Sequence, residues 1–181
     1  MVGLLLIGSG AREVAIARKI KENASSTLLY CVASTTNPQI KNLSELYFEQ
    51  SPNKISGVLK SIKNLSIDLA IVGPENPLEA GLVDALEKVG IPCVGPKKGV
   101  AKIETSKAFA RNILDHCSPE MNPERKEFVS VDGVEDFLHH LQGEYVIKND
   151  GLMGGKGVKI SGEHLHSVEE SLAYALSRIH I

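Results

Sequence analysis

Residues 2–13 read VGLLLIGSGARE, a short apolar run that meets a glycine turn and then a segment with helical spacing. The run Val2–Ile7 predicts a β-strand, and Arg12–Lys21 predicts a helix because its apolar residues recur three and four positions apart. A strand that turns into a helix through glycine presents free backbone N–H groups and the positive end of the helix dipole at the turn. The stretch therefore predicts the first βα unit of an α/β fold, with an anion-binding turn at Gly8–Gly10.

The same alternation of strands and helices continues to about Val100. The strand segments are nearly continuously apolar, which is typical of a parallel sheet covered by helices on both faces. The sequence thus predicts a doubly wound, Rossmann-like domain. The predicted strands are Leu28–Ala33, Leu46–Phe48, Ile67–Val72 and Ile91–Val94, and the predicted helices are Lys54–Asn64 and a segment from Leu78 to Val89.

After Val100 the pattern changes. Ser106–Cys117 predicts a helix that no strand follows closely, and Ser118–Lys126 is rich in proline and charge, which is typical of a linker. We therefore expect a first domain at residues 1–101, a connecting helix and linker at 102–126, and a smaller second unit at 127–181. The second unit is predicted to contain the strands Glu127–Val131, Tyr145–Lys148 and Val158–Ser161 and the helices Val134–Leu141 and Val168–Ile179.

The composition is that of a globular protein. Hydrophobic residues make up 43% of the 181 residues and charged residues 23%, which excludes collagen-like and disordered chains. A formal net charge of -2 lacks the basic excess of most nucleic-acid-binding domains. No apolar run approaches the roughly 20 residues that cross a bilayer, and the N-terminus has no signal-peptide pattern. We therefore expect a soluble, cytoplasmic protein without nucleic-acid or membrane partners.

The glycine turn Gly8–Gly10 can be interpreted in three ways. A dinucleotide-binding fingerprint would have a third glycine where Glu13 stands, and an acidic residue at the end of the second strand, where residues 33–37 read ASTTN. Both features are missing, which argues against NAD. A bound phosphate or another anion is the favoured interpretation, and a plain tight turn is the alternative.

A second motif, GPENPL at Gly73–Leu78, directly follows the predicted strand Ile67–Val72. In open α/β sheets, ligands bind beyond the carboxyl ends of the strands, so this loop should lie beside the glycine turn. Two prolines stiffen the loop, and Glu75 would present a carboxylate to hydroxyl or amine groups of a phosphorylated ligand. Alternatively, Glu75 only favours the N-terminus of the helix that follows.

The third motif, KNDGLMGGKGV at Lys148–Val158, is a predicted strand, a glycine-rich loop and a second strand. It is not a P-loop, because Asp150 stands where the first glycine is required and Gly157 replaces the Ser or Thr that holds magnesium. A hairpin of this kind can close as a lid over a triphosphate, with Lys148 and Lys156 supplying positive charge. The alternative is a glycine-rich hairpin whose lysines are only solvated.

Other candidate residues give weaker signals. Glu104–Lys107 reads ETSK and predicts a helix start with Ser106 as the N-cap. No pattern of Ser, His, Asp or Cys side chains indicates a nucleophilic site, so no catalytic residue is assigned. Cysteines without CxxC spacing and histidines without ligand spacing indicate no metal site within the chain.

Taken in order, these motifs resemble the N-terminal part of the glycinamide ribonucleotide synthetase (phosphoribosylamine-glycine ligase) family, ATP-grasp enzymes of purine biosynthesis. The family pattern has a glycine-rich turn ending in Arg-Glu, then Gly-Pro-Glu-x-Pro-Leu, Gly-Pro, Glu-x-Ser-Lys and Lys-x-Asp-Gly-Leu-x-x-Gly-Lys-Gly-Val. The chain departs from the family at Val14, where His is usual, and at Thr35–Thr36, where Pro-Gly is usual. The matching segments are Arg12–Glu13, Gly73–Leu78, Gly95–Pro96, Glu104–Lys107 and Lys148–Val158.

The resemblance implies a Rossmann-like pre-ATP-grasp domain followed by a partial ATP-grasp domain that contains the glycine-rich lid. It implies ATP as a substrate and Mg2+ as a cofactor whose ligands would lie beyond Ile181, so the chain would be a truncated fragment that is inactive alone. The residues it implies for phosphoribosylamine binding are Gly8, Ser9, Gly10, Asn37, Gly73, Pro74, Glu75 and Pro77. Those it implies for ATP binding are Lys107, Lys148, Gly151, Leu152, Gly154, Gly155, Lys156, Gly157 and Val158.

The implied reaction joins glycine to 5-phosphoribosylamine with cleavage of ATP and yields glycinamide ribonucleotide, ADP and phosphate. ATP would phosphorylate the glycine carboxylate, and the amine of phosphoribosylamine would then attack the acyl phosphate. Catalysis of this kind rests mostly on positioning and charge neutralisation. We expect a monomer. From the residues alone, a non-catalytic phosphosugar- or nucleotide-binding module and a Rossmann dehydrogenase stay open as other functions.

Overall fold

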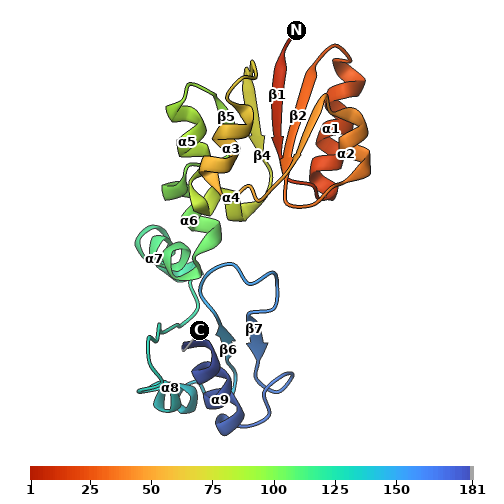
Figure 1. Cartoon of the computed structure of the whole chain (residues 1–181). Coiled ribbons are helices and arrows are strands. Elements are labelled where there is room, and N and C mark those ends of the chain that lie inside the picture. The colour runs from red at the N-terminus through yellow and green to blue at the C-terminus, as the bar shows by residue number, and fades with distance from the viewer. Residues whose placement is uncertain (180–181) are drawn as a thin grey trace. The chain divides into compact units, whose positions relative to one another are not determined.

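The computed structural model describes residues 1–179, which form two compact units (Figure 1). The first unit is Met1–Glu104, and the second begins at Thr105. Helix α6 (Lys98–Thr105) ends at this division, so most of the segment expected to be a connector belongs to the second unit. Within the described residues, none of the helices combines the length and apolar character needed to cross a membrane.

The first unit is built on a parallel five-stranded sheet in the order β3-β2-β1-β4-β5. Leu5 of the central strand β1 lies opposite Tyr30 on one side and Ala70 on the other. The strand order reverses direction between β1 and β4, which is where open α/β sheets bind ligands. The predicted parallel α/β architecture is confirmed. The strands are β1 (Gly3–Ile7), β2 (Leu28–Ala33), β3 (Leu46–Glu49), β4 (Leu69–Val72) and β5 (Cys93–Val94).

Helices cover both faces of this sheet, with α1 and α2 on one side and α3 and α5 on the other (Figure 1). The two faces bury separate apolar clusters because side chains alternate along each strand. Leu5 lies in one cluster with Leu82, whereas Leu6 lies in the other with Ala17 and Ile40. Besides α6, the helices are α1 (Ala11–Asn23), α2 (Pro38–Leu43), α3 (Ile55–Ile62), α4 (Glu75–Ala80) and α5 (Leu82–Lys88).

The helices of the first unit differ from the sequence-based expectation in two respects. The helix expected from Leu78 to Val89 is broken at Gly81, whose φ of 92° ends α4 before α5 begins. Neither α2 nor α6 is predicted by periodicity, and the six residues of α2 contain too few turns to show it. α2 depends on its cap, since the Asn37 side chain accepts hydrogen bonds from the first backbone N–H groups of the helix.

The second unit contains a two-stranded antiparallel sheet, in which Val146 lies opposite Ile160. Tyr145 and Ala175 lie in its apolar core with residues of α8. The Tyr145 hydroxyl is 2.7 Å from the Ser171 hydroxyl, so this buried polar group has a partner. The elements are α7 (Lys107–Cys117), the 3-10 helix η1 (Pro119–Met121), α8 (Val134–His140), β6 (Val146–Lys148), β7 (Val158–Ile160) and α9 (Val168–Ile179).

The strand predicted at Glu127–Val131 is wrong. These residues form no strand in the structure, and Val129 is 94% exposed. The segment ends instead in a turn, where the Ser130 hydroxyl donates to the Asp132 carboxylate at 2.9 Å. A β-branched run becomes a strand only where another strand can pair with it, and β6 and β7 pair with each other alone.

Candidate functional site

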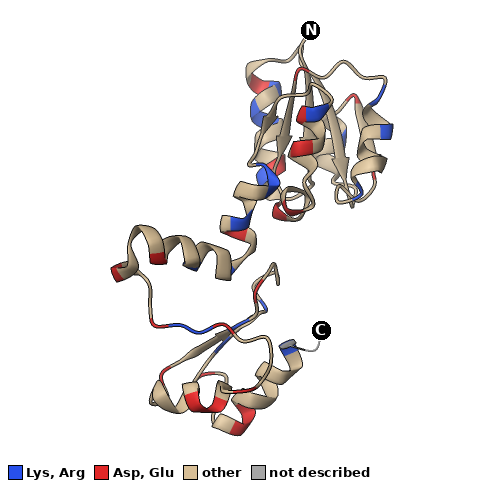
Figure 2. Cartoon of the chain, turned by 90° about the vertical axis from the view of Figure 1, so that its left-hand side faces the viewer, with Lys and Arg blue, Asp and Glu red and all other residues tan. Residues whose placement is uncertain are grey.

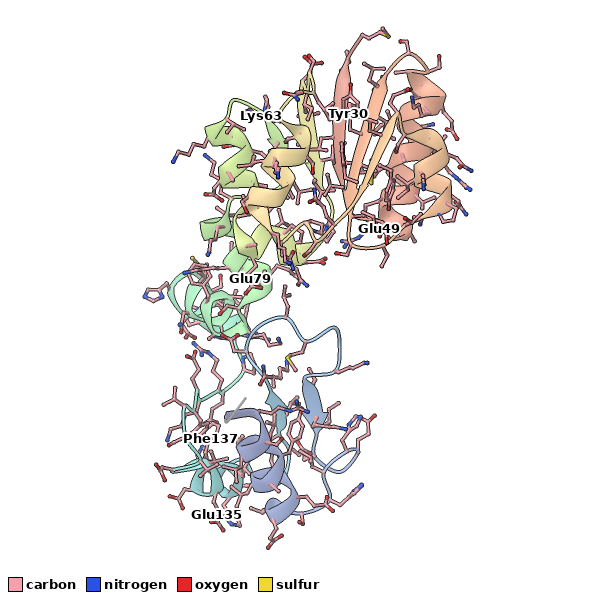
Figure 3. The ribbon with its side chains drawn as sticks, viewed as in Figure 1. Tyr30, Glu49, Lys63, Glu79, Glu135 and Phe137 are labelled. Carbon is pink, nitrogen blue, oxygen red and sulfur yellow. The ribbon has the colours of Figure 1, made fainter. Side chains whose placement is uncertain are left out.

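Three of the predicted segments lie at one edge of the first unit, beyond the carboxyl ends of neighbouring parallel strands. Gly8–Gly10 follows β1, Thr35–Asn37 follows β2 and Gly73–Pro77 follows β4. Glu49, the last residue of β3, marks this edge in Figure 3, whereas Tyr30 lies within the sheet. Because β1 and β4 are neighbours at the switch point, the glycine turn and the proline-rich loop come together.

A buried carboxylate, that of Glu13, lies beneath the glycine turn. The residue is only 3% exposed, and its Oε2 accepts the Gly10 N–H at 2.6 Å. Gly10 is the residue that precedes α1, so this bond satisfies one of the free N–H groups at the helix start. The Gly10 amide, which the sequence places among the phosphate-binding groups, therefore already has a partner inside the protein.

Glu13 also accounts for the glycine at the start of the proline-rich loop. A Cβ atom at Gly73 would lie 2.1 Å from Glu13 Oε1, so the carboxylate itself excludes a side chain there. Oε1 is buried and has no hydrogen-bond partner within residues 1–179. Glu13 stands where a dinucleotide fingerprint has its third glycine, and this departure is the sequence signal for its structural role.

An ion pair joins the first two motifs at the rim of the edge. Arg12 Nη2 donates to Glu75 Oε1 at 3.0 Å, and both side chains are partly exposed. The backbone N–H of Glu75, and then the Arg12 guanidinium, hold the pKa of the Glu75 carboxyl below its usual value. The Glu75 carboxylate in turn raises the pKa of Arg12. Because Glu75 is the first residue of α4, it also sits where a helix start favours an acidic residue.

Asn37 ties the loop after β2 to the glycine turn. Its Nδ2 donates to the Ser9 carbonyl at 2.9 Å, and the Ser9 and Thr35 hydroxyls are 3.2 Å apart. The Tyr47 hydroxyl donates to the Thr35 carbonyl at 2.7 Å and accepts the Asn37 N–H at 3.2 Å. Neither Thr35 nor Tyr47 is among the predicted binding residues, and only the pairing of β2 with β3 brings Tyr47 to this loop. Hydroxyls, helix-start N–H groups and one guanidinium suit an anionic ligand that also carries hydroxyl groups.

In the second unit, the ETSK segment meets the start of the glycine-rich loop. Lys107 Nζ donates to the Gly151 carbonyl at 2.9 Å, and the Lys107 backbone N–H donates to Asp150 Oδ1 at 2.6 Å. The two segments are far apart in the sequence, so no local spacing predicts this contact. Asp150 is a functional candidate that the sequence does not single out.

The glycine-rich loop has a backbone that only glycine adopts readily. Gly151, Gly154 and Gly155 have φ values of 88°, 56° and 79°. Within residues 1–179, the structure gives no side-chain hydrogen bond or ion pair to Lys148 or Lys156, so both ammonium groups face no fixed partner. The loop therefore brings a permissive backbone and positive charge together.

The remaining predicted residues of this loop lie at its ends. Val158 is the first residue of β7 and lies opposite Lys148 of β6, so the loop begins and ends at a paired position of the hairpin. Leu152 is half-buried, and a Cβ at Gly157 would lie 2.8 Å from the side chain of Met153. The loop is thus closed tightly at its base.

Figure 2 shows charged residues of both signs in both units. Among residues 1–179, no group of three or more His, Cys, Asp or Glu side chains is arranged to hold a metal ion.

The family model and the curated relatives that match the sequence agree with each other. The family model of the phosphoribosylglycinamide synthetase N domain matches residues 2–104. The chain is 41% identical over 172 residues to the phosphoribosylamine–glycine ligase of Methanobrevibacter smithii, covering 95% of this chain and 38% of that protein. The ligase of Methanosarcina barkeri is 42% identical over 171 residues, covering 94% and 39% respectively. The chain thus spans about 40% of the length of the curated relatives it matches.

Solved structures with the same fold include an ADP complex of N5-carboxyaminoimidazole ribonucleotide synthetase. It matches with a TM-score of 0.72 and 15% identity, covering 96% of this chain and 45% of that one. The phosphoribosylamine–glycine ligase of Thermotoga maritima matches with a TM-score of 0.68 and 21% identity, covering 97% and 39%. At these identities the likeness shows the fold alone.

Proposed function

The chain belongs to the phosphoribosylglycinamide synthetase family, and from that premise we propose that the protein carrying it joins glycine to 5-phosphoribosylamine in an ATP-dependent step of cytoplasmic purine biosynthesis. Relatives about 40% identical to the chain are named for this ligation. The observation that carries the proposal is the edge of the first unit, where the glycine turn, Asn37 and the Glu75 loop come together.

Phosphoribosylamine carries a phosphate, ribose hydroxyls and an amine, and this edge offers a partner for each. The N–H groups of α1 that Glu13 leaves free, with the hydroxyls of Ser9 and Thr35, would bind the phosphate. Glu75 would accept hydrogen bonds from the ribose hydroxyls or the amine, with Arg12 holding its carboxylate in place. The stiff Gly73–Pro77 loop keeps that carboxylate in position.

We assign the second unit to the beginning of an ATP-grasp domain. Lys107, Lys148 and Lys156 would supply positive charge to the ATP phosphates, and the loop glycines would let the backbone approach them. Leu152 within the loop and Val158 at its end would contact the apolar parts of the nucleotide. Any magnesium ion that accompanies ATP would take its ligands from outside the described residues.

The chemistry follows from the inertness of a carboxylate toward amines. ATP transfers its terminal phosphoryl group to a glycine carboxylate oxygen, which releases ADP and forms an acyl phosphate. The amine nitrogen of phosphoribosylamine then attacks the acyl carbon, the carbon–oxygen bond to phosphate breaks, and an amide forms with loss of a proton. The residues of this chain would contribute positioning and charge neutralisation.

The test uses the complete protein encoded by the gene that carries this chain. We expect ADP release to require both glycine and phosphoribosylamine, and the product to have the mass of glycinamide ribonucleotide. Glu75→Gln removes a charge-assisted hydrogen bond and should lower kcat/KM for phosphoribosylamine about tenfold. Phosphosugar binding without ADP release would instead support a non-catalytic binding module.

A further inference from the structure

The carboxylate of Asp150 occupies the N-terminus of α7. Oδ1 accepts the backbone N–H groups of Lys107 at 2.6 Å and Ala108 at 3.2 Å, and Oδ2 accepts the Ser106 hydroxyl at 3.0 Å. The Ser106 oxygen accepts the Phe109 N–H at 3.1 Å. The first three N–H groups of this helix are therefore satisfied within the protein. The N–H groups at the start of α7 bind Asp150 and Ser106, so none of these three groups is free to bind an external anion.

The electrostatics favour the ionised form of Asp150. Burial opposes ionisation, but hydrogen bonds from the Ala108 N–H, the Ser106 hydroxyl and the Lys107 N–H outweigh it and hold the pKa of this carboxyl below its usual value. The positive end of the α7 dipole acts in the same direction. Three hydrogen bonds to its carboxylate therefore hold Asp150 at the start of α7.

The neighbouring residue extends the attachment to a charged side chain. Lys107 Nζ donates to the carbonyl of Gly151, so Lys107 contacts Asp150 with its backbone and Gly151 with its side chain. At the other end of the loop, the Asn149 N–H donates to the Gly157 carbonyl at 2.9 Å. The start of α7 and the base of the glycine-rich loop thus form one hydrogen-bonded unit. An ammonium group has three donors, so Lys107 keeps donors for a second acceptor.

We propose that Asp150 is a positioning residue for ATP, which fixes the Lys107 ammonium group and the base of the glycine-rich loop at one spacing, so that both meet the same phosphate chain. This inference rests on the proposed function, because it assumes that the loop binds ATP. Without Asp150, the N–H groups of α7 and the Gly151 carbonyl lose their common anchor. Lys107 and the loop would then have to be ordered by the nucleotide itself, which weakens binding.

The first arm of the test measures the attachment in the complete protein without nucleotide. Residue-resolved hydrogen exchange should be at least about tenfold faster at Lys107 and Ala108 in Asp150→Ala than in the wild type, with a smaller rise in Asp150→Asn, which keeps one acceptor oxygen. Asp84→Ala is the matched control. Its carboxylate accepts the Lys98 N–H at 2.8 Å at the start of α6, so it removes the same kind of bond in the other unit.

The second arm measures ATP in the complete protein. Asp150→Ala should weaken the affinity for a non-hydrolysable ATP analogue, and raise KM for ATP, about tenfold, with KM for glycine unchanged. Asp150→Asn should restore part of the affinity, and Asp84→Ala should leave it unchanged. A purely structural role would lower kcat through loss of active protein and leave the nucleotide affinity of the remaining protein intact.

Each outcome decides the proposal. Unchanged exchange at Lys107 and Ala108, or faster exchange with unchanged ATP affinity, would overturn it. If the complete protein binds ATP but makes no glycinamide ribonucleotide, the proposed function fails, and the tenfold loss of affinity still decides the role of Asp150. If the protein binds no ATP at all, both are wrong.

Discussion

Replacing Gly73 with alanine tests whether Glu13 shapes the candidate site. The alanine Cβ would lie 2.1 Å from Glu13 Oε1 and 2.9 Å from its Cδ, far inside the roughly 3.5 Å at which non-bonded carbon atoms make good contact. Because Glu13 is buried, its carboxylate can move away only by losing its bond to the Gly10 N–H. The variant must therefore either keep the clash between the alanine Cβ and the Glu13 carboxylate or lose the hydrogen bond from the Gly10 N–H to Glu13.

The size of the effect follows from these two terms. Overpacking costs about 1–3 kcal/mol, and loss of a hydrogen bond to a charged group costs about 1.5–3 kcal/mol. Since the protein will adopt the cheaper relaxation, we expect Gly73→Ala to lower the free energy of unfolding of the first unit by about 2 kcal/mol. Glu13→Ala removes the obstructing oxygen. In that background Gly73→Ala should cost less than about 1 kcal/mol, which is a coupling of at least about 1 kcal/mol in a double-mutant cycle.

The assay is urea unfolding followed by the NMR signals of β1 and β4, for the wild type, the two single variants and the double variant. Gly99→Ala is the control, because a Cβ at that position of α6 meets no atom within 4 Å. It should stabilise the protein by up to about 1 kcal/mol through helix propensity. A Gly73→Ala protein as stable as the wild type would refute the role given to Glu13. So would a loss of stability that persists in full when Glu13 is absent.

Three further predictions concern single side chains. Arg12→Ala should move the carboxyl titration of Glu75 to higher pH, and an unchanged NMR titration would contradict the ion pair. The small contribution of this exposed pair to stability is present at neutral pH and is lost as the pH falls through the lowered pKa of Glu75. Burial raises the pKa of Cys31 to about 12, so at pH 8 a disulfide reagent should label exposed Cys117 quickly and Cys31 slowly, and Cys117→Ser should abolish the fast phase. Lys156→Ala should slow the ATP-dependent step of the complete protein about ten- to a hundredfold, and unchanged kinetics would leave Lys156 as a solvated surface residue.

The sheet of the first unit was predictable because its signal is local. Leu28–Ala33 is an unbroken apolar run, and such a run has few alternatives to a strand covered on both faces. The same rule fails at Glu127–Val131, since an apolar run near Val129 carries no information on whether a partner strand is present. Gly81 shows a second limit, because helical spacing continues across the point where its positive φ divides α4 from α5.

The candidate site was predictable by position but not by contact. The motifs place Gly8–Gly10 and Glu75 at one sheet edge, and topology does bring them there. The partners of each group are set by side-chain directions that spacing does not encode. Glu13 takes the Gly10 amide, and Asp150 reaches back to Lys107 across 43 positions of sequence. Both residues lie within the quoted motifs, yet only the folded backbone shows which atoms they bind.

The strand order also has a consequence for synthesis on the ribosome. β1 is the first strand of the sheet to be synthesised, but it lies at the centre of the sheet. The residues that pack on its two faces are synthesised at different times. The buried residues of the cluster on the α1 and α2 side, which include Leu6 and Ile40, all precede Leu43, and the last residue that packs against them is Ile71 of β4. The opposite cluster, with Leu5, waits for Leu86. A nascent chain that has emerged only to β3 therefore carries one face that is nearly covered and one bare apolar face. Translation speed over the next forty or so codons, roughly several seconds in length, sets how long that face is open to aggregation or to chaperones.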